Sequence, residues 1–184
     1  MKQFFRLFAL LLILGSAPCM AEDVVIVHNF QTLYSAGNLT ITPNAELEAN
    51  KIGTVNDGIV YTCQYGVSFG NDLATGTQKA INLQGNNRRV VTTQIDNLKE
   101  IRMKNTLLNG ATYQNLKIKL STDGSTWGET IDMVAVPATN QYKATFAKGN
   151  YFVRIYTNEN VNVSITELRF VTEPEDCNCF VYTP

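Results

Sequence analysis

Alternation of hydrophobic and polar residues predicts short β-strands along most of this chain. In the clearest run, Leu116, Ile118 and Leu120 share one face of a strand. Lys117 and Lys119 share the other face, so one side is buried and one meets water, as in antiparallel sheets. Further strands are expected at 24–30, 39–43, 59–69, 79–83, 89–95, 98–105, 128–136, 142–146, 151–157 and 161–171.

The spacing of these runs indicates the fold class. Gly, Asn, Asp and Pro separate them, and very little of the chain has a helical period. Ten or eleven short strands without strand–helix alternation predict an all-β protein, an antiparallel β-sandwich or jelly roll, and not a parallel α/β fold.

The last run changes its parity part-way along. Val163 and Ile165 follow one alternation, whereas Leu168 and Phe170 follow the other. An extra residue in one strand of a pair re-phases the side chains, so we expect a bulge near Thr166.

The chain begins with the pattern of a secretory signal peptide. Lys2 and Arg6 precede a short apolar segment, and small residues lead to an expected cleavage site after Ala21. We therefore expect a signal peptide at 1–21, a sandwich domain at 22–172 and a C-terminal tail or connector at 173–184. Acylation of Cys19 is the alternative processing. No apolar run reaches the roughly 18 residues of a transmembrane helix, so the protein is expected in the periplasm, at the cell surface or in the medium.

Charge and cysteine content narrow the function. Without Lys2 and Arg6, the 15 basic residues fall to 13 against 16 acidic ones, a balance that does not suit a phosphate backbone, so nucleic acid is not an expected partner. Three cysteines follow the leader, and in an oxidising compartment Cys63 is expected to pair with Cys177 or Cys179. An intermolecular bond is the alternative. The chain has one histidine, so the usual Cys and His zinc site is not available.

Two patterns bear on catalysis. Residues 66–70, GVSFG, match the Gly-x-Ser-x-Gly elbow of serine hydrolases, but no helical pattern follows Ser68 and the histidine precedes it, so we interpret the match as chance. Two convergent carboxylates would suffice for glycoside hydrolysis, which keeps a glycoside-active enzyme open as an alternative.

The segment 116–130, LKIKLSTDGSTWGET, has the pattern of a tight hairpin. Gly124 supplies the positive φ of the turn, and Trp127 follows where a large ring can fold back over the sheet. With Ser121 and Asp123, this hairpin resembles that of the galactose-binding-like β-sandwiches, the discoidin-type and related carbohydrate-binding modules. The strands at 149–170 are similar to the closing strands of the same family.

This resemblance implies a role for several residues. Trp127, Asp123 and Gly124 would be structural. The protein would be a non-catalytic module that binds carbohydrate through loops, and it would need no cofactor, although a structural calcium ion is common in the family and Glu167 is the candidate ligand. The weak candidates for carbohydrate binding are Tyr65, Asn71, Asp72, Asn86, Arg88 and Arg89.

Two alternatives stay open beside carbohydrate binding. The acidic tail with its two prolines is typical of a connector, so the chain could be a structural or spacer domain without a ligand, attached to a downstream enzyme or anchor. The glycoside-active enzyme is the other. The leader and the strands rich in Asn and Thr resemble secreted proteins of gut Bacteroidetes.

Overall fold

A computed structural model describes residues 22–38, 50–54, 57–63, 67–108, 113–137, 139 and 141–174. The predicted signal peptide, the predicted strand at 39–43 and residues 175–184 of the predicted tail lie outside the described residues. The elements are β1 (Val24–Asn29), α2 (Phe30–Ser35), β2 (Asn50–Thr54), β3 (Val60–Cys63), β4 (Val67–Asn71), β5 (Lys79–Gln84), β6 (Arg89–Thr92), β7 (Ile95–Leu108), the 3-10 turn η1 (Tyr113–Asn115), β8 (Leu116–Ser121), β9 (Ile131–Asp132), β10 (Val134–Val136), β11 (Gln141–Thr157) and β12 (Asn162–Thr172).

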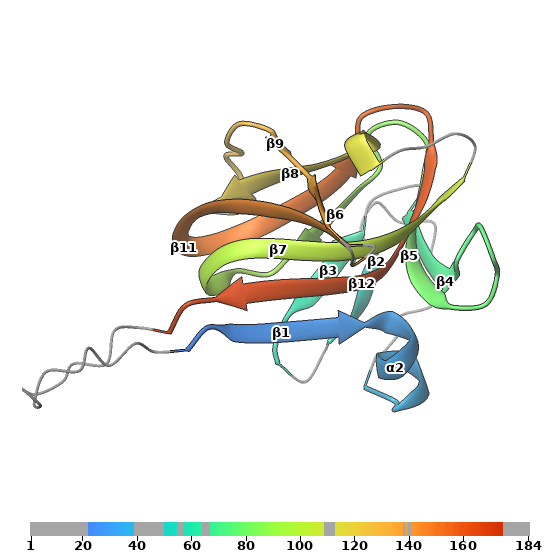
Figure 1. The fold of residues 1–184 in the computed structure, drawn as a ribbon, viewed down its shortest axis with the longest axis horizontal. Coiled ribbons are helices and arrows are strands. Elements are labelled where there is room, and N and C mark those ends of the chain that lie inside the picture. The colour runs from blue at the N-terminus through green and yellow to red at the C-terminus, as the bar shows by residue number, and fades with distance from the viewer. Residues whose placement is uncertain are drawn as a thin grey trace, which may run out of the picture.

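The strands form two antiparallel layers, which confirms the predicted all-β sandwich (Figure 1). Sheet A contains β10, the first half of β11, β7 and β12, in that order. The other side of β12 pairs with β5 along its first residues and with β1 along its last residues. β4 extends sheet A beyond β5. Sheet B runs β2, β3, β6, the second half of β11, β8 and β9.

Strand β11 joins the two sheets. Its first half pairs with β7 in sheet A, and residues from Phe152 to Thr157 pair with β8 and β6 in sheet B. The register with β7 shifts on both sides of Gly149, which marks the bend. We had predicted two separate strands at 142–146 and 151–157; the gap between them is this bend in one continuous strand.

The expected irregularity of the last strand is confirmed. The register between β12 and β7 shifts between Ile165 and Glu167, so one extra residue lies at Thr166. As a result, Val163 and Ile165 face the core before the bulge and Leu168 and Phe170 face it afterwards.

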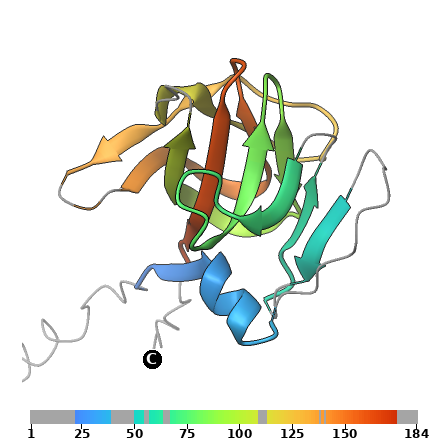
Figure 2. The same cartoon turned by 90° about the vertical axis from the view of Figure 1, so that its right-hand side faces the viewer.

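The short helix α2 was not expected from the sequence. Asn29 caps it, because its side-chain oxygen accepts a hydrogen bond from the backbone N–H of Thr32 at 3.0 Å. Phe30 anchors the helix to the core, because its ring packs against the rings of Tyr61 and Phe69. Figure 2 shows α2 below the ends of the strands. Six residues are too few to display a helical period, and the residues before it read as a strand.

A buried polar pair, His28 and Tyr61, lies in the core between the sheets. His28 and Tyr61 are both buried and hydrogen-bonded to each other, and the other imidazole nitrogen of His28 lies 2.5 Å from a carboxylate oxygen of Asp57. Burial raises the pKa of Tyr61 well above its ordinary value, and the charge of Asp57 raises it further. Because both rings are enclosed by core residues, their hydrogen bond holds β1 against β3.

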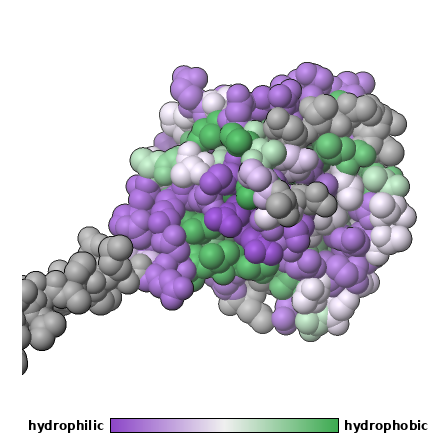
Figure 3. Space-filling view, in the orientation of Figure 1, coloured by the Kyte–Doolittle hydropathy of each residue, from purple (hydrophilic) through white to green (hydrophobic). Residues whose placement is uncertain are grey.

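The start of β1 and the end of β12 lie side by side, with Val24 opposite Thr172 (Figure 1). The free edge of β1 exposes Val24, Val25 and Val27, and hydrophobic atoms gather there on the surface in Figure 3. No helix in the described part of the chain is long and apolar enough to span a membrane.

Candidate ligand-binding face

The outer face of sheet B combines aromatic rings and cations. In the second half of β11, Val153 and Ile155 point into the core, so Phe152, Arg154 and Tyr156 point outward. Each of these three outward residues is only partly exposed.

The neighbouring strands extend the same face. Register places Lys119 of β8 opposite Arg154, and Lys117 opposite Tyr156. On the other side, Arg89 of β6 is also opposite Tyr156 and therefore diagonal to Arg154. We call this surface the basic–aromatic face; with the tryptophan described below, it consists of Arg89, Lys117, Lys119, Trp127, Phe152, Arg154 and Tyr156.

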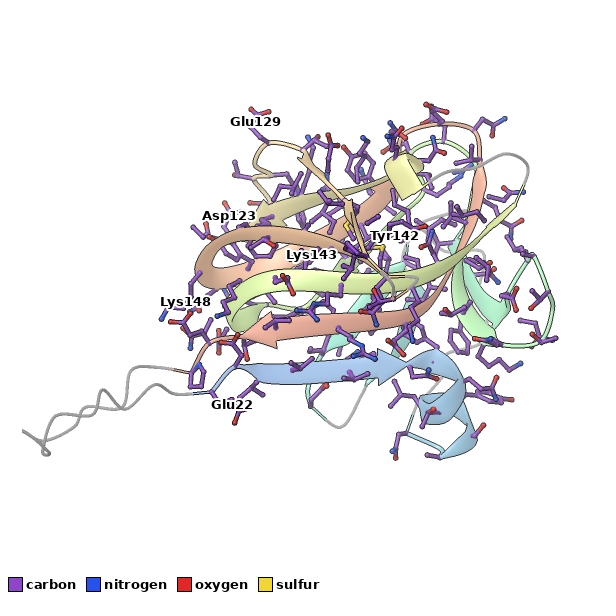
Figure 4. The ribbon with its side chains drawn as sticks, viewed as in Figure 1. Glu22, Asp123, Glu129, Tyr142, Lys143 and Lys148 are labelled. Atoms are coloured by element: carbon purple, nitrogen blue, oxygen red, sulfur yellow. The ribbon has the colours of Figure 1, made fainter. Side chains whose placement is uncertain are left out.

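The loop after β8 folds back over this face, and Figure 4 shows Asp123 and Glu129 on it. Gly124 has φ +75, and a Cβ there would lie 3.5 Å from the ring of Phe152. Asp123 accepts hydrogen bonds from the backbone N–H groups of Thr126 (2.7 Å) and Ser125 (2.8 Å) and from the hydroxyl of Ser121 (2.8 Å). These bonds, those of Thr126 and Ser125 first, hold the pKa of Asp123 well below its ordinary value.

Trp127 lies on the outer face and not between the sheets. Its ring, partly exposed, stacks on the guanidinium group of Arg154, with 3.9 Å between the guanidinium carbon and the ring centroid. The loop continues to Thr130, whose hydroxyl lies 2.9 Å from that of Tyr156. The predicted tight hairpin is therefore a longer loop, residues 122–130 between β8 and β9, and it lies over the outer face of sheet B with the Trp127 ring as part of a polar surface.

Three of the four cations of this face, Arg89, Lys119 and Arg154, have no carboxylate partner among the described residues. Burial lowers the pKa of Arg154, and the charge of Arg89 lowers it further. The Nε atoms of both arginines are buried without a hydrogen-bond partner. Among the described residues, Lys117 alone in the basic–aromatic face has an ion pair, to Asp132 at 2.7 Å.

The loop residues predicted to bind carbohydrate do not form one site. Asn71 and Asp72 lie at the start of the β4–β5 loop, whereas Asn86 and Arg88 lie in the β5–β6 loop at the opposite end of β5. Tyr65 lies outside the described residues. Among the candidates that the structure describes, Arg89 alone belongs to the basic–aromatic face.

Asp72 has a structural position in its loop. Its side chain is 2% exposed and accepts hydrogen bonds from the backbone N–H groups of Thr75, Thr77 and Gln78. The hydroxyls of Thr75 and Thr106 also donate to it. Burial alone would raise the pKa of Asp72, but these bonds lower it well below its ordinary value. Its oxygens are thus already occupied.

Arg88 and Asn71 are also engaged in local contacts. The Nε of Arg88 donates to the carbonyl oxygen of Gln84 at 3.0 Å, which closes the β5–β6 loop. The side-chain oxygen of Asn71 accepts from Lys79 at 2.8 Å. Asn86 is exposed at the tip of its loop.

Glu167, the predicted calcium ligand, lies on the outer face of sheet A and is 4% exposed. Arg169 donates to its carboxylate at 2.7 Å and Lys104 lies 3.6 Å away. Burial would raise the pKa of Glu167, but the hydrogen bonds from Arg169 and Asn29 and these charges lower it. The described residues contain no group of three or more His, Cys, Asp or Glu side chains that could hold a metal ion, and the calcium site stays a prediction.

Two further sequence motifs can be placed. Cys63 is buried, forms no disulfide within the described residues, and has its pKa raised by burial; its predicted disulfide partners, Cys177 and Cys179, lie outside them. Ser68 lies in the middle of β4 and not at a strand-to-helix turn, so the hydrolase elbow is not formed.

Sequence reasoning missed Arg154, Lys119 and Tyr156 as site residues. A signal was available, because residues 151–157 alternate between aliphatic and polar or aromatic side chains. This alternation alone does not identify a site, because the neighbours of β11 are not known from it. Only the pairing of β11 with both β6 and β8 places Arg89, Arg154 and Lys119 on one surface.

No family model and no curated protein matches this chain. Among solved structures it is similar to a carbohydrate-binding module of family 29, with 12% identity, 88% of this chain and 99% of that one covered, and a TM-score of 0.41. It is also similar to the low-affinity xylan-binding module CBM86 from Roseburia intestinalis (12%; 81% and 94%; 0.36) and to a mutant of the lectin binding domain of lectinolysin in complex with Lewis b (11%; 52% and 72%; 0.40). At these identities and TM-scores, the similarity says nothing about the ligand of this chain.

Proposed function

We propose that this protein is an exported, non-catalytic carbohydrate-binding module whose ligand lies on the basic–aromatic face. The observation that carries the proposal is the position of Trp127 over Arg154, which lies close enough to Arg89 to be affected by its charge. Carbohydrate sites combine a ring that covers the apolar face of a sugar with polar groups that bind its hydroxyls. The outer face of sheet B carries three rings and two arginines whose Nε atoms have no hydrogen-bond partner among the described residues.

The scaffold supports this role, because most side chains of the face project from paired strands. The stack of Arg154 on Trp127 orients the indole ring, and the loop passes close to Phe152, since a Cβ added at Gly124 would lie 3.5 Å from its ring. A surface that is ordered before binding loses less conformational entropy when a ligand docks.

A non-catalytic role is supported by the carboxylates of this region. Asp132 pairs with Lys117, and Asp123 accepts the hydrogen bonds of its own turn. A general acid in glycoside hydrolysis needs a pKa raised by its surroundings, whereas the pKa of Asp123 is lowered.

The test is binding of glycans to the chain expressed without residues 1–21. Trp127 is the single tryptophan, so glycan binding on this face should change its fluorescence. In calorimetry, Trp127→Ala should weaken binding roughly tenfold or more, because a stacked ring contributes about 1 to 2 kcal/mol.

Tyr34→Ala is the matched control. Tyr34 also carries a stacked cation, Lys79 at 4.7 Å, but it lies on α2. We expect this variant to bind as the parent protein does. A folded protein that binds no glycan in a broad plant and host array would contradict the proposal and favour the spacer domain.

A further inference from the structure

We propose that Arg89 and Arg154 form a subsite for an anionic group, so that the glycan bound by this face is acidic. The chemistry recognised is an oxyanion on a sugar, either a uronate carboxylate or a sulfate ester. This inference rests on the proposed function and names the class of ligand.

The first argument is the register of sheet B. Lys119 lies directly opposite Arg154, and Arg89 lies diagonally across on the other side of the same strand. Like charges opposite each other destabilise a sheet, because their Cβ atoms are only about 5 Å apart. An isolated structural sheet gains nothing from three adjacent cations, whereas an anion placed between them would remove the repulsion.

The second argument is a contrast with sheet A. On its outer face, Arg102 pairs with Glu100 and Arg169 pairs with Glu167, so cations and carboxylates alternate. Within the described residues, Arg89, Arg154 and Lys119 have no such partner. The whole chain has a net charge of −1, so this cluster does not reflect a generally basic protein.

The third argument is unsatisfied hydrogen bonding. The Nε atoms of Arg89 and Arg154 are buried without an acceptor in the described structure. An unpaired buried donor is costly, and burial together with Arg89 already lowers the pKa of Arg154. The planar guanidinium group matches the two oxygens of a carboxylate or sulfate, and two such groups can bind one anion between them.

Trp127 sets the geometry of this subsite. The guanidinium carbon of Arg154 lies 3.9 Å from the centroid of the Trp127 ring, so the indole covers one side of this cation and an oxyanion would bind from another side. A sugar whose acidic group binds there would place its own ring close to the indole ring.

The experiment compares three glycans of equal length: a galacturonate oligosaccharide, a sulfated galactan oligosaccharide and a neutral galactan oligosaccharide. At least one acidic glycan should bind roughly tenfold or more tightly than the neutral one, and its affinity should fall as salt rises from about 0.05 M to about 0.5 M. Whichever acidic glycan binds more tightly identifies the source of the anion.

Variants separate the anion subsite from the aromatic platform. Arg89→Gln leaves the stack on Trp127 untouched, and it should weaken acidic binding roughly tenfold while the affinity for the neutral glycan changes less than about twofold. Arg154→Lys keeps the charge but loses the two-pronged geometry, so an intermediate loss is expected. Lys148→Gln removes one cation from the same strand, where Lys148 pairs with Glu173, and should change nothing.

Several outcomes would overturn the inference. Equal binding of neutral and acidic glycans without salt dependence would reject the anion subsite and leave carbohydrate binding intact. Equally tight binding of single-stranded DNA of the same charge would show a surface that binds any polyanion. Binding of no glycan by a folded protein would reject both proposals.

Discussion

Asp72 shows how one buried carboxylate can hold a whole loop. Three backbone N–H groups of residues 75–78 and two threonine hydroxyls converge on its oxygens. Unpaired backbone donors in a partly buried loop are costly, so the carboxylate replaces the strand partners that the β4–β5 connection lacks. The sequence showed Asp72 only as one polar residue among several in a loop.

Asp72→Ala should lower the free energy of unfolding by about 2 to 4 kcal/mol, because several donors lose a charged acceptor together. Chemical denaturation at neutral pH measures this change. Asn86→Ala, at the exposed tip of the other loop, is the control and should stay within about 0.5 kcal/mol.

Stability should also depend on pH through Asp72. Its pKa is lowered in the folded protein, so between that value and the unfolded value of about 3.9 the unfolded chain binds more protons. The stabilisation is therefore complete above about pH 5 and is lost as pH falls toward the folded-state pKa. The difference in unfolding free energy between the parent protein and Asp72→Asn should shrink over that interval; a constant difference would contradict this account.

Strand β11 is the element on which the architecture depends. Hydrophobic alternation predicted both of its halves, and it predicted the bulge in β12 at Thr166. It could not predict that the β11 halves are continuous, because residues 147–150 have the composition of a turn. The two halves are continuous because β11 pairs with β7 before the bend and with β8 after it.

Gly149 is the residue that permits this bend. A Cβ at Gly149 would lie 2.6 Å from the ring of Tyr151, so Gly149→Ala should destabilise the protein by about 1 to 3 kcal/mol. In a Tyr151→Ala background, the same substitution should cost much less. Thermal unfolding of the four proteins measures this coupling, and additive effects would show that the ring is not the obstacle.

The whole molecule has one core shared by two sheets that are joined through β11. Neither sheet can bury its apolar face without the other, and the start of β1 lies beside the end of β12. Single domains of up to about 150 residues usually unfold in one step. The same coupling is expected here, because separating the sheets breaks β11.

We therefore expect a single unfolding transition for the chain without residues 1–21. Fluorescence of Trp127 reports on sheet B, amide exchange in β7 reports on sheet A, and the two should give the same unfolding free energy. A bound glycan should raise the midpoint in both signals together. Separate transitions would show that the sheets are independent units.

Local pattern was enough for the fold class, most strands and the turn at Asp123 and Gly124, because alternation and turn chemistry depend on neighbours in the chain. The position of the candidate site depended on long-range pairing. Residues 89, 119, 127 and 154 are distant in sequence, and only the order of strands β6, β11 and β8 brings their side chains onto one face. The energy of strand pairing is distributed over many contacts between distant strands, so a short segment of sequence cannot predict the strand order.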